Sequence, residues 1–274
     1  MKNLFLCEWK RLWCRKTIWI CFFSIPIILY ASAKYYLRVN QKVIFDSPQF
    51  TSFGNFPTAA IQEQLVLAFN LIVILIAVMS ITEEYRSGQL RMIMIRPIKF
   101  SEIFIAKFLV LIVTIALYSL IYFLFSLILG YFLFPKINDI SIFYHVKVFG
   151  ISASLMYSVK YYLLALLTLI AISSVVFFIS IISKSVIIAL GVNVGFILIS
   201  MTYPIILQAF FRGGGLLINK IMLLSLTHIQ HMGIAFMLGQ KHTLFLYISF
   251  VLLAYTLIFS TLSYFVFSKQ DQLI

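Results

Sequence analysis

A charged segment between two apolar runs carries the side chains best suited to recognising a partner. It covers residues 83–100 and reads Glu-Glu-Tyr-Arg-Ser-Gly-Gln-Leu-Arg-Met-Ile-Met-Ile-Arg-Pro-Ile-Lys-Phe. Gly88 loosens the chain near its start and Pro97 ends its apolar part, so a short helix is expected between them. The apolar ridge of that helix is Leu90, Ile93 and Met94. Such a helix suits a groove on another protein, or it is a connector that lies on lipid headgroups.

The sequence lacks the motifs that would give the chain catalysis of its own. Gly213, Gly214 and Gly215 are followed by Leu-Leu-Ile instead of Gly-Lys-Ser/Thr, so they cannot form a phosphate-binding loop. His228 and His231 are three residues apart, but no Cys or carboxylate lies near them in the sequence. This favours structural or interfacial histidines over metal ligands. We therefore predict no catalytic residues, no bound cofactor or metal, and a protein that is not an enzyme.

The composition assigns these segments to a membrane protein. Of 274 residues, 63% are hydrophobic and 11% are charged, whereas soluble domains carry roughly 25% charged residues. The net charge is +13, and the charges sit in short clusters between apolar runs. That pattern is typical of membrane topology and of contact with anionic lipid headgroups. It argues against nucleic-acid binding, which needs basic residues gathered on one face.

Runs free of charged residues predict six transmembrane helices in an all-α, polytopic fold. About 20 helical residues cross the hydrocarbon core. The expected spans cover about 17–37, 64–82, 108–135, 158–183, 185–211 and 242–268. The fourth and fifth are separated by the turn around Lys184, so we expect a helical hairpin there.

The basic residues also predict the orientation of the chain. They concentrate in the N-terminal segment and in the loop after the second span, where Arg86, Arg91, Arg96, Lys99 and Lys107 lie. Loops rich in Lys and Arg stay on the cytoplasmic side. We therefore expect a multi-pass protein of the cell membrane with both termini in the cytoplasm.

Residues 1–16 are expected to form an amphipathic helix at the membrane surface. Phe5, Trp9 and Trp13 share one face with Leu12. The opposite side is expected to carry Glu8, Arg11 and Arg15. A helix of this type lies in the interface with its indole rings at headgroup depth. It is a membrane anchor, or an elbow that also touches a cytoplasmic partner, and the two roles are compatible.

The charge-free runs offer few polar side chains along a transport path. The candidates are Asn70, Asn193, Thr202, Tyr203 and Gln208. Ion-coupled transporters usually keep ionisable residues inside the membrane, although backbone carbonyls of broken helices can hold Na⁺. We infer that the driving energy comes from another subunit.

The segment between the second and third spans resembles the signature region of type-2 ABC-transporter permeases. The matching residues are Glu84 to Arg91, Arg96-Pro97, and Glu102-Ile103 through Lys107. Glu8-Trp9-Lys10-Arg11 is similar to the elbow helix of that family, and Ser180 to Ala189 is similar to its short cytoplasmic turn. The likeness in layout covers nearly the whole chain, and the sequence-specific match covers about thirty residues.

The resemblance implies a fold and a set of partners. The family has six spans, a coupling helix between spans two and three (here within the cytoplasmic loop 83–100), and a re-entrant region before the last span, here 212–241. Two permease subunits pair, as a homodimer or heterodimer, and engage two soluble ATPase subunits that carry ATP and Mg²⁺. The segment 136–160 is longer than the family's usual connection: it holds an extra outer helix, or the fourth span begins near Ser152 and buries Lys160.

The resemblance also assigns a docking surface for the ATPase. Its expected residues are Glu8, Arg11, Glu83, Glu84, Tyr85, Arg86, Gly88, Leu90, Arg91, Ile93, Arg96, Pro97 and Lys99. By analogy with the family, the function would be ATP-driven export of a hydrophobic or amphipathic cargo, such as an antimicrobial peptide, a drug or a lipid-like compound, which could confer antimicrobial resistance. The alternatives are an ion-coupled secondary transporter and a membrane sensor or scaffold that transports nothing.

Overall fold

The computed structural model describes residues 2–44, 47–86, 100–142, 144–145, 148–183, 185–211, 215–240 and 244–269. Within these ranges the chain is almost entirely helical and holds no strand longer than an isolated bridge. The helices are α1 (Lys2–Trp13), α2 (Lys16–Asn40), α3 (Phe56–Gln64), α4 (Asn70–Arg86), α6 (Phe100–Leu133), α7 (Ile151–Ile182), α8 (Val186–Phe210), α9 (Leu216–Met222), α10 (Leu226–His228), α11 (Ile234–Leu238) and α12 (Phe245–Lys269). Two π-helical turns, η1 (Leu65–Phe69) and η2 (Ile229–Gly233), interrupt this pattern.

Six helices in the described ranges are long and apolar enough to cross a membrane, which confirms the predicted all-α fold with six spans. They cover Lys16–Asn40, Phe56–Thr82, Phe100–Leu133, Ile151–Ile182, Val186–Phe210 and Phe245–Ser268. These helices are longer than most of the charge-free runs and include Glu63, Lys107 and Lys160. The charge-free runs therefore understate the length of these helices, because the helices continue past charged residues.

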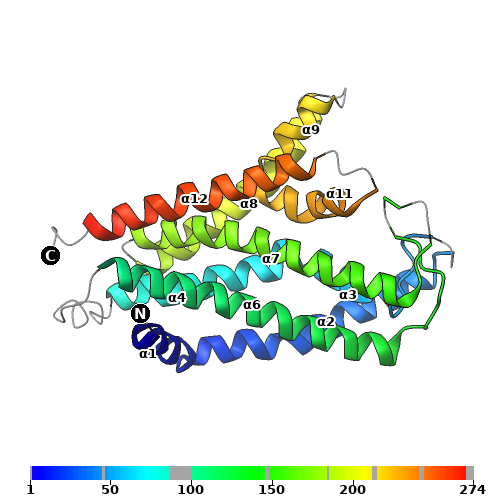
Figure 1. The fold of residues 1–274 in the computed structure, drawn as a ribbon, viewed down its shortest axis with the longest axis horizontal. Helices are drawn as coiled ribbons and strands as arrows, with labels where there is room; N and C mark the ends of the chain where they lie inside the picture. The colour runs from blue at the N-terminus through cyan, green and yellow to red at the C-terminus, as the bar shows by residue number, and fades with distance from the viewer. Residues whose placement is uncertain are drawn as a thin grey trace.

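The spans form an elongated bundle with the α3–α4 span and α7 at its centre (Figure 1). About 70% of the most apolar stretch of these two spans is buried, against about 20% for α8 and α12. Figure 1 shows α1, the ends of α4 and α12 and the start of α6 at one end of the bundle, which we call the terminal end. The opposite end, which we call the cavity end, holds the connections α2–α3 and α6–α7 together with α11.

The connection between α6 and α7 is not helical in its described residues, 134–142, 144–145 and 148–150. Ile140 and Phe149 form an isolated antiparallel bridge across it, with both N–H···O distances at 2.9 Å. Helix α7 begins at Ile151, which agrees with the alternative in which the fourth span begins near Ser152. The burial of Lys160 expected with that alternative is wrong, because Lys160 is exposed on this helix.

Residues 87–99, which hold most of the predicted coupling segment, lie outside the described residues. The backbone of Glu83 to Arg86 is helical and completes α4. The predicted interfacial helix has a counterpart in α1, and the predicted re-entrant region has one in the short helices from Leu216 to Leu238. Their placement relative to a membrane stays a prediction.

Candidate functional site

The terminal end of the bundle is built around a buried ion pair. The ammonium group of Lys107 on α6 lies 2.8 Å from the Glu8 carboxylate on α1, with side-chain exposures of 1% and 3%. Lys107 also donates to the carbonyl of Ser80 on α4 at 3.2 Å. One ammonium group therefore joins α1, α4 and α6, and α4 and α6 are the helices on either side of residues 87–99.

The expectation that Glu8 lies on a polar face of the first helix is wrong. Glu8 and Leu12 are the buried residues of α1, and they face α6. The reason is electrostatic, because an unpaired buried Lys107 would be costly and Glu8 neutralises it. Arg11 remains partly exposed at 23% and donates to the other Glu8 oxygen at 3.1 Å.

The aromatic side of α1 continues onto the first span. The rings of Phe5, Trp9 and Trp13 follow one another at centroid distances of 6.0 and 5.2 Å. Trp13 then meets Trp19 and Phe22 of α2. Tryptophan prefers the interfacial layer of a membrane, so this series of rings suits the depth predicted for α1.

The predicted contacts with an ATPase fall into two groups. Glu8 and Arg11 are described, and the carboxylate of Glu8 is already paired inside the chain. The others lie in the last turn of α4, where only the backbone is described, or outside the described residues: Glu83, Glu84, Tyr85, Arg86, Gly88, Leu90, Arg91, Ile93, Arg96, Pro97 and Lys99. Their contact with a partner stays a prediction.

The middle of the bundle holds a reciprocal amide pair. Asn70 donates to Gln230 at 2.7 Å and Gln230 donates back at 3.1 Å, and both side chains are fully buried. Gln230 lies 3.4 Å from the hydroxyl of Thr168 on α7. Asn70 directly follows η1 and Gln230 lies within η2, so the pair joins two π-helical turns. Such turns often mark functional positions in helices.

The five predicted path residues do not form a common site in the described structure. Asn70 is held by Gln230, and Asn193 is buried and donates to the carbonyl of Ala189 at 2.8 Å. Thr202 bonds back to its own helix, Tyr203 donates to Ile221 O, and Gln208 donates to Met222 Sδ. A role for these residues along a transport path stays a prediction.

Three tyrosines from three different spans fix helix α3 at the cavity end. Tyr36 of α2 donates to Ala59 O at 3.0 Å, Tyr122 of α6 to Ala60 O at 3.2 Å, and Tyr162 of α7 to Pro57 O at 3.2 Å. Helix α3 is only nine residues long and ends in η1. Since short helices gain most of their stability from tertiary contacts, these three bonds set the position of the helix that carries Gln62 and Glu63.

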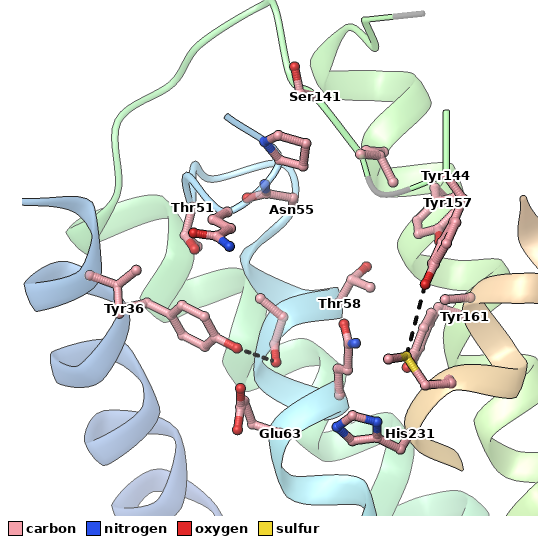
Figure 2. A pocket seen from close by; sticks show the side chains of 18 of the residues that line it. Tyr36, Thr51, Asn55, Thr58, Glu63, Ser141, Tyr144, Tyr157, Tyr161 and His231 are labelled. Carbon is pink, nitrogen blue, oxygen red and sulfur yellow. Dashed lines mark hydrogen bonds between the residues drawn. The ribbon is translucent and has the colours of Figure 1, made fainter. Parts of the chain in front are cut away.

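A cavity of about 460 Å³ opens beside α3 (Figure 2). Its walls come from α2, α3, α7, η2 and α11 and from the connections between them. The lining residues are Tyr35, Tyr36, Val39, Pro48, Gln49, Thr51, Asn55, Thr58, Ala59, Gln62, Glu63, Ser141, Ile142, Tyr144, Tyr157, Tyr161, His231, Met232 and Ala235. Figure 2 shows Tyr36 and Glu63 on one side, Tyr157 and Tyr161 on the other, and His231 at the base.

Some polar side chains of this lining are already engaged. Asn55 accepts from Ser52 N at 2.7 Å and donates to Phe50 O at 2.8 Å. Thr58 shares a 2.7 Å bond with Ser158. Tyr161 is different, because its side chain is only 1% exposed and its hydroxyl has no hydrogen-bond partner in the described chain. Buried polar groups are normally paired, so this hydroxyl is an unsatisfied acceptor at the cavity wall.

Tyr144 closes the cavity in a rare backbone conformation. Its φ is 64°, in the left-handed region that residues with a Cβ seldom adopt. The neighbouring His145 contacts Leu238 O at 3.0 Å, and Gln240 N donates to Tyr144 O at 3.3 Å. The ring packs on Phe236 of α11. Contacts to α11 and to the residues after it therefore hold this strained residue at the cavity wall.

The two histidines singled out in the sequence lie near each other but have different surroundings in the structure. His231 lines the cavity, whereas His228 is half-buried in α10. Burial, and then the nearby His231, lower the pKa of the His228 imidazole, which is therefore neutral at pH 7. Within the described residues, no three His, Cys, Asp or Glu side chains gather closely enough to hold a metal ion.

The pairing of residues within these sites gave no signal in the sequence, although Asn70, Glu8 and Lys107 were each singled out for another reason. Gln230 and Asn70 are 160 positions apart, and Glu8 and Lys107 are 99 apart. Glu63 directly precedes the charge-free run 64–82 that predicts the second span, so the sequence places it just outside that span. A helical projection that continued through Glu63 would have placed it on the same helix as Asn70.

Comparison with known proteins matches residues 4–202 to a family described as ABC-2 family transporter protein. No curated protein matches the sequence. The matched range covers α1, the first four spans and most of α8, so it includes both partners of the ion pair and the helices on either side of residues 87–99. With six spanning helices and a family match over more than half of its length, the chain is a multi-pass membrane protein that belongs to the ABC-2 transporter family.

Proposed function

We propose that this chain is the permease subunit of an ATP-driven exporter that moves a hydrophobic or amphipathic cargo across the cell membrane. Family membership supports the permease role. The observation that carries the proposal is the Glu8–Lys107 pair, because it makes α1 and the helices next to residues 87–99 one rigid unit. A rigid unit is suited to passing a partner's motion into the spans.

In this proposal the terminal end faces the cytoplasm and the cavity end faces outward. Two soluble ATPase subunits bind ATP and Mg²⁺ and dock on the loop 83–100 and on α1. A second permease subunit completes the complex, as an identical or a related chain. Glu8 positions α1 through Lys107, while the basic residues of the loop contact the ATPase.

The test is purification of the tagged permease from its own cells, followed by identification of bound proteins. An ABC ATPase should copurify, and the permease alone should not hydrolyse ATP. Arg86→Glu and Arg91→Glu should lower ATPase recovery by about tenfold or more, since charge reversal at an interface costs several kcal/mol. Arg38→Glu, at the far end of α2, is the matched control. Full ATPase recovery and coupling in both loop variants would overturn the docking assignment.

One observation favours the ion-coupled alternative. Glu63 places a carboxylate on a helix that is long and apolar enough to span a membrane. Reconstituted liposomes separate the two functions. The exporter transports only when the ATPase and ATP are present. Transport by the permease alone, driven by a Na⁺ or proton gradient, would replace the proposal with a secondary transporter.

A further inference from the structure

The cavity beside α3 differs in charge from the rest of the molecule. The chain has 21 Lys and Arg residues and only 8 Asp and Glu residues. Among the described residues that line the cavity there is no Lys or Arg, and Glu63 is the one carboxylate. Lys34 of α2, close to this wall in sequence, places its ammonium 4.9 Å from the ring centre of Tyr30. The described lining is therefore electronegative in a strongly basic protein.

Tyrosines supply most of the aromatic surface of this lining. Five of them line it: Tyr35, Tyr36, Tyr144, Tyr157 and Tyr161. Tyr36 also interacts electrostatically with the Glu63 carboxylate, so ring and charge share one side of the cavity. Aromatic faces attract ammonium and guanidinium groups, and several rings together recognise quaternary ammonium ligands.

Hydrogen-bonding capacity points to the same class of ligand. The Tyr161 hydroxyl is buried without a partner in the described chain, and its oxygen can accept a bond from a donor. The Glu63 carboxylate is exposed to the cavity and accepts only. An anionic or phosphate ligand would meet this carboxylate and no described cationic Lys or Arg to balance it.

We propose that this cavity binds the ammonium or guanidinium group of an amphipathic cation. Glu63 neutralises the charge, the tyrosine rings surround it, and Tyr161 takes one of its donors where the group has N–H bonds. A volume of about 460 Å³ suits a headgroup with a short chain. The rings of Tyr35 and Tyr144 are the exposed aromatic part of the lining, against which an apolar chain could pack. The conclusion that this ligand is the exported cargo rests on the proposed function.

Binding is tested on the purified full chain in nonionic maltoside micelles, by equilibrium dialysis with hexyltrimethylammonium. Hexanesulfonate is the anionic comparison of similar length. The wild type should bind the cation and not the sulfonate. Glu63→Gln should weaken cation binding by about tenfold or more, because the attraction between the carboxylate and the ammonium charge is lost. Glu102→Gln, at the terminal end, should bind as the wild type does.

A matching thermal unfolding midpoint shows that each variant is folded. Competition by a short-chain phosphatidylcholine would identify a lipid headgroup as the occupant. Competition only by alkylammonium compounds would identify a free amphipathic cation. Equal affinity of wild type and Glu63→Gln, binding of the sulfonate as tightly as the cation, or no binding at all would overturn the proposal. Because this assay uses neither ATPase nor ATP, its failure is distinct from failure of the proposed transport function.

Discussion

The two ends of the bundle differ in how their carboxylates are placed. At the terminal end, Lys107 and Glu8 are buried and neutralise each other at 2.8 Å. At the cavity end, Glu63 is exposed and the buried Tyr161 hydroxyl has no partner in the described chain. Paired groups hold elements together, whereas unpaired groups are free to meet a ligand. In the proposed function, the terminal end couples the chain to the ATPase and the cavity end recognises the cargo.

Breaking the ion pair at the terminal end should have the largest effect on stability. Lys107→Met leaves the Glu8 carboxylate buried without its main partner, which typically costs about 3–5 kcal/mol. The thermal unfolding midpoint in micelles should fall steeply. Lys160→Met, which changes an exposed lysine on α7, is the control.

The double variant Glu8→Gln/Lys107→Met tests whether the loss of stability comes from an unpaired buried charge. Removing both charges should recover most of the loss, because no buried charge is left uncompensated. If Lys107→Met unfolds at the wild-type temperature, the pair does not hold α1 to the bundle.

Breaking the amide pair in the middle of the bundle should also lower stability, but by less than breaking the ion pair at the terminal end. Gln230→Leu leaves the amide of Asn70 without its reciprocal partner. Interhelical bonds within membranes are typically worth about 0.6 kcal/mol and at most about 2. A double-mutant cycle with Asn70→Leu, read from unfolding midpoints, measures their coupling. Additive effects would show that the pair contributes nothing.

The tyrosine bonds to α3 should contribute less again. Tyr162→Phe removes one donor to Pro57 O while keeping the ring, so one interhelical bond of about 0.6 kcal/mol should be lost, against two such bonds in the amide pair. Cation binding should weaken as well, because α3 positions Glu63. Tyr264→Phe, on α12, is a suitable control for the loss of a tyrosine hydroxyl. Unchanged stability and binding in Tyr162→Phe would contradict the role assigned to this bond.

Removing the Tyr161 hydroxyl at the cavity end should change stability least. Any change should be a gain, whereas the other substitutions lower stability. Tyr161→Phe removes a hydroxyl that has no partner in the described chain, so stability should stay constant or rise by up to about 1 kcal/mol. Affinity for hexylammonium, which has N–H bonds to donate, should nevertheless fall, whereas affinity for hexyltrimethylammonium, which has none, should not change. A clear loss of stability would show that this hydroxyl is structurally engaged and would remove the contrast between the two ends.

The sequence predicts most of the fold because a bilayer excludes charge. Charge-free runs indicate the six spans, and the spacing of Phe5, Trp9 and Trp13 indicates α1. The same rule misplaces span ends, since Lys107 continues α6 once Glu8 pairs with it. Such pairing joins residues far apart in the chain and leaves no local pattern.

The cavity could not be predicted for a similar reason. Its tyrosines come from α2, α7 and a connecting segment, and each of them reads in isolation as an ordinary aromatic residue of a span or loop. The π-helical turns beside Asn70 and around Gln230 also lack a distinct sequence pattern. What the sequence does carry is the family signature around residues 84–107, which indicates a partner and says nothing of the cargo.

The most direct test of the whole account is ATP hydrolysis by the copurified complex in liposomes as hexyltrimethylammonium is increased. The account predicts that the cation stimulates hydrolysis, and that Glu63→Gln requires about tenfold more cation for the same stimulation. A hydrolysis rate that does not change with cation concentration would contradict the assignment of recognition to the cavity end and coupling to the terminal end. The same concentration dependence in the wild-type and Glu63→Gln complexes would contradict it as well.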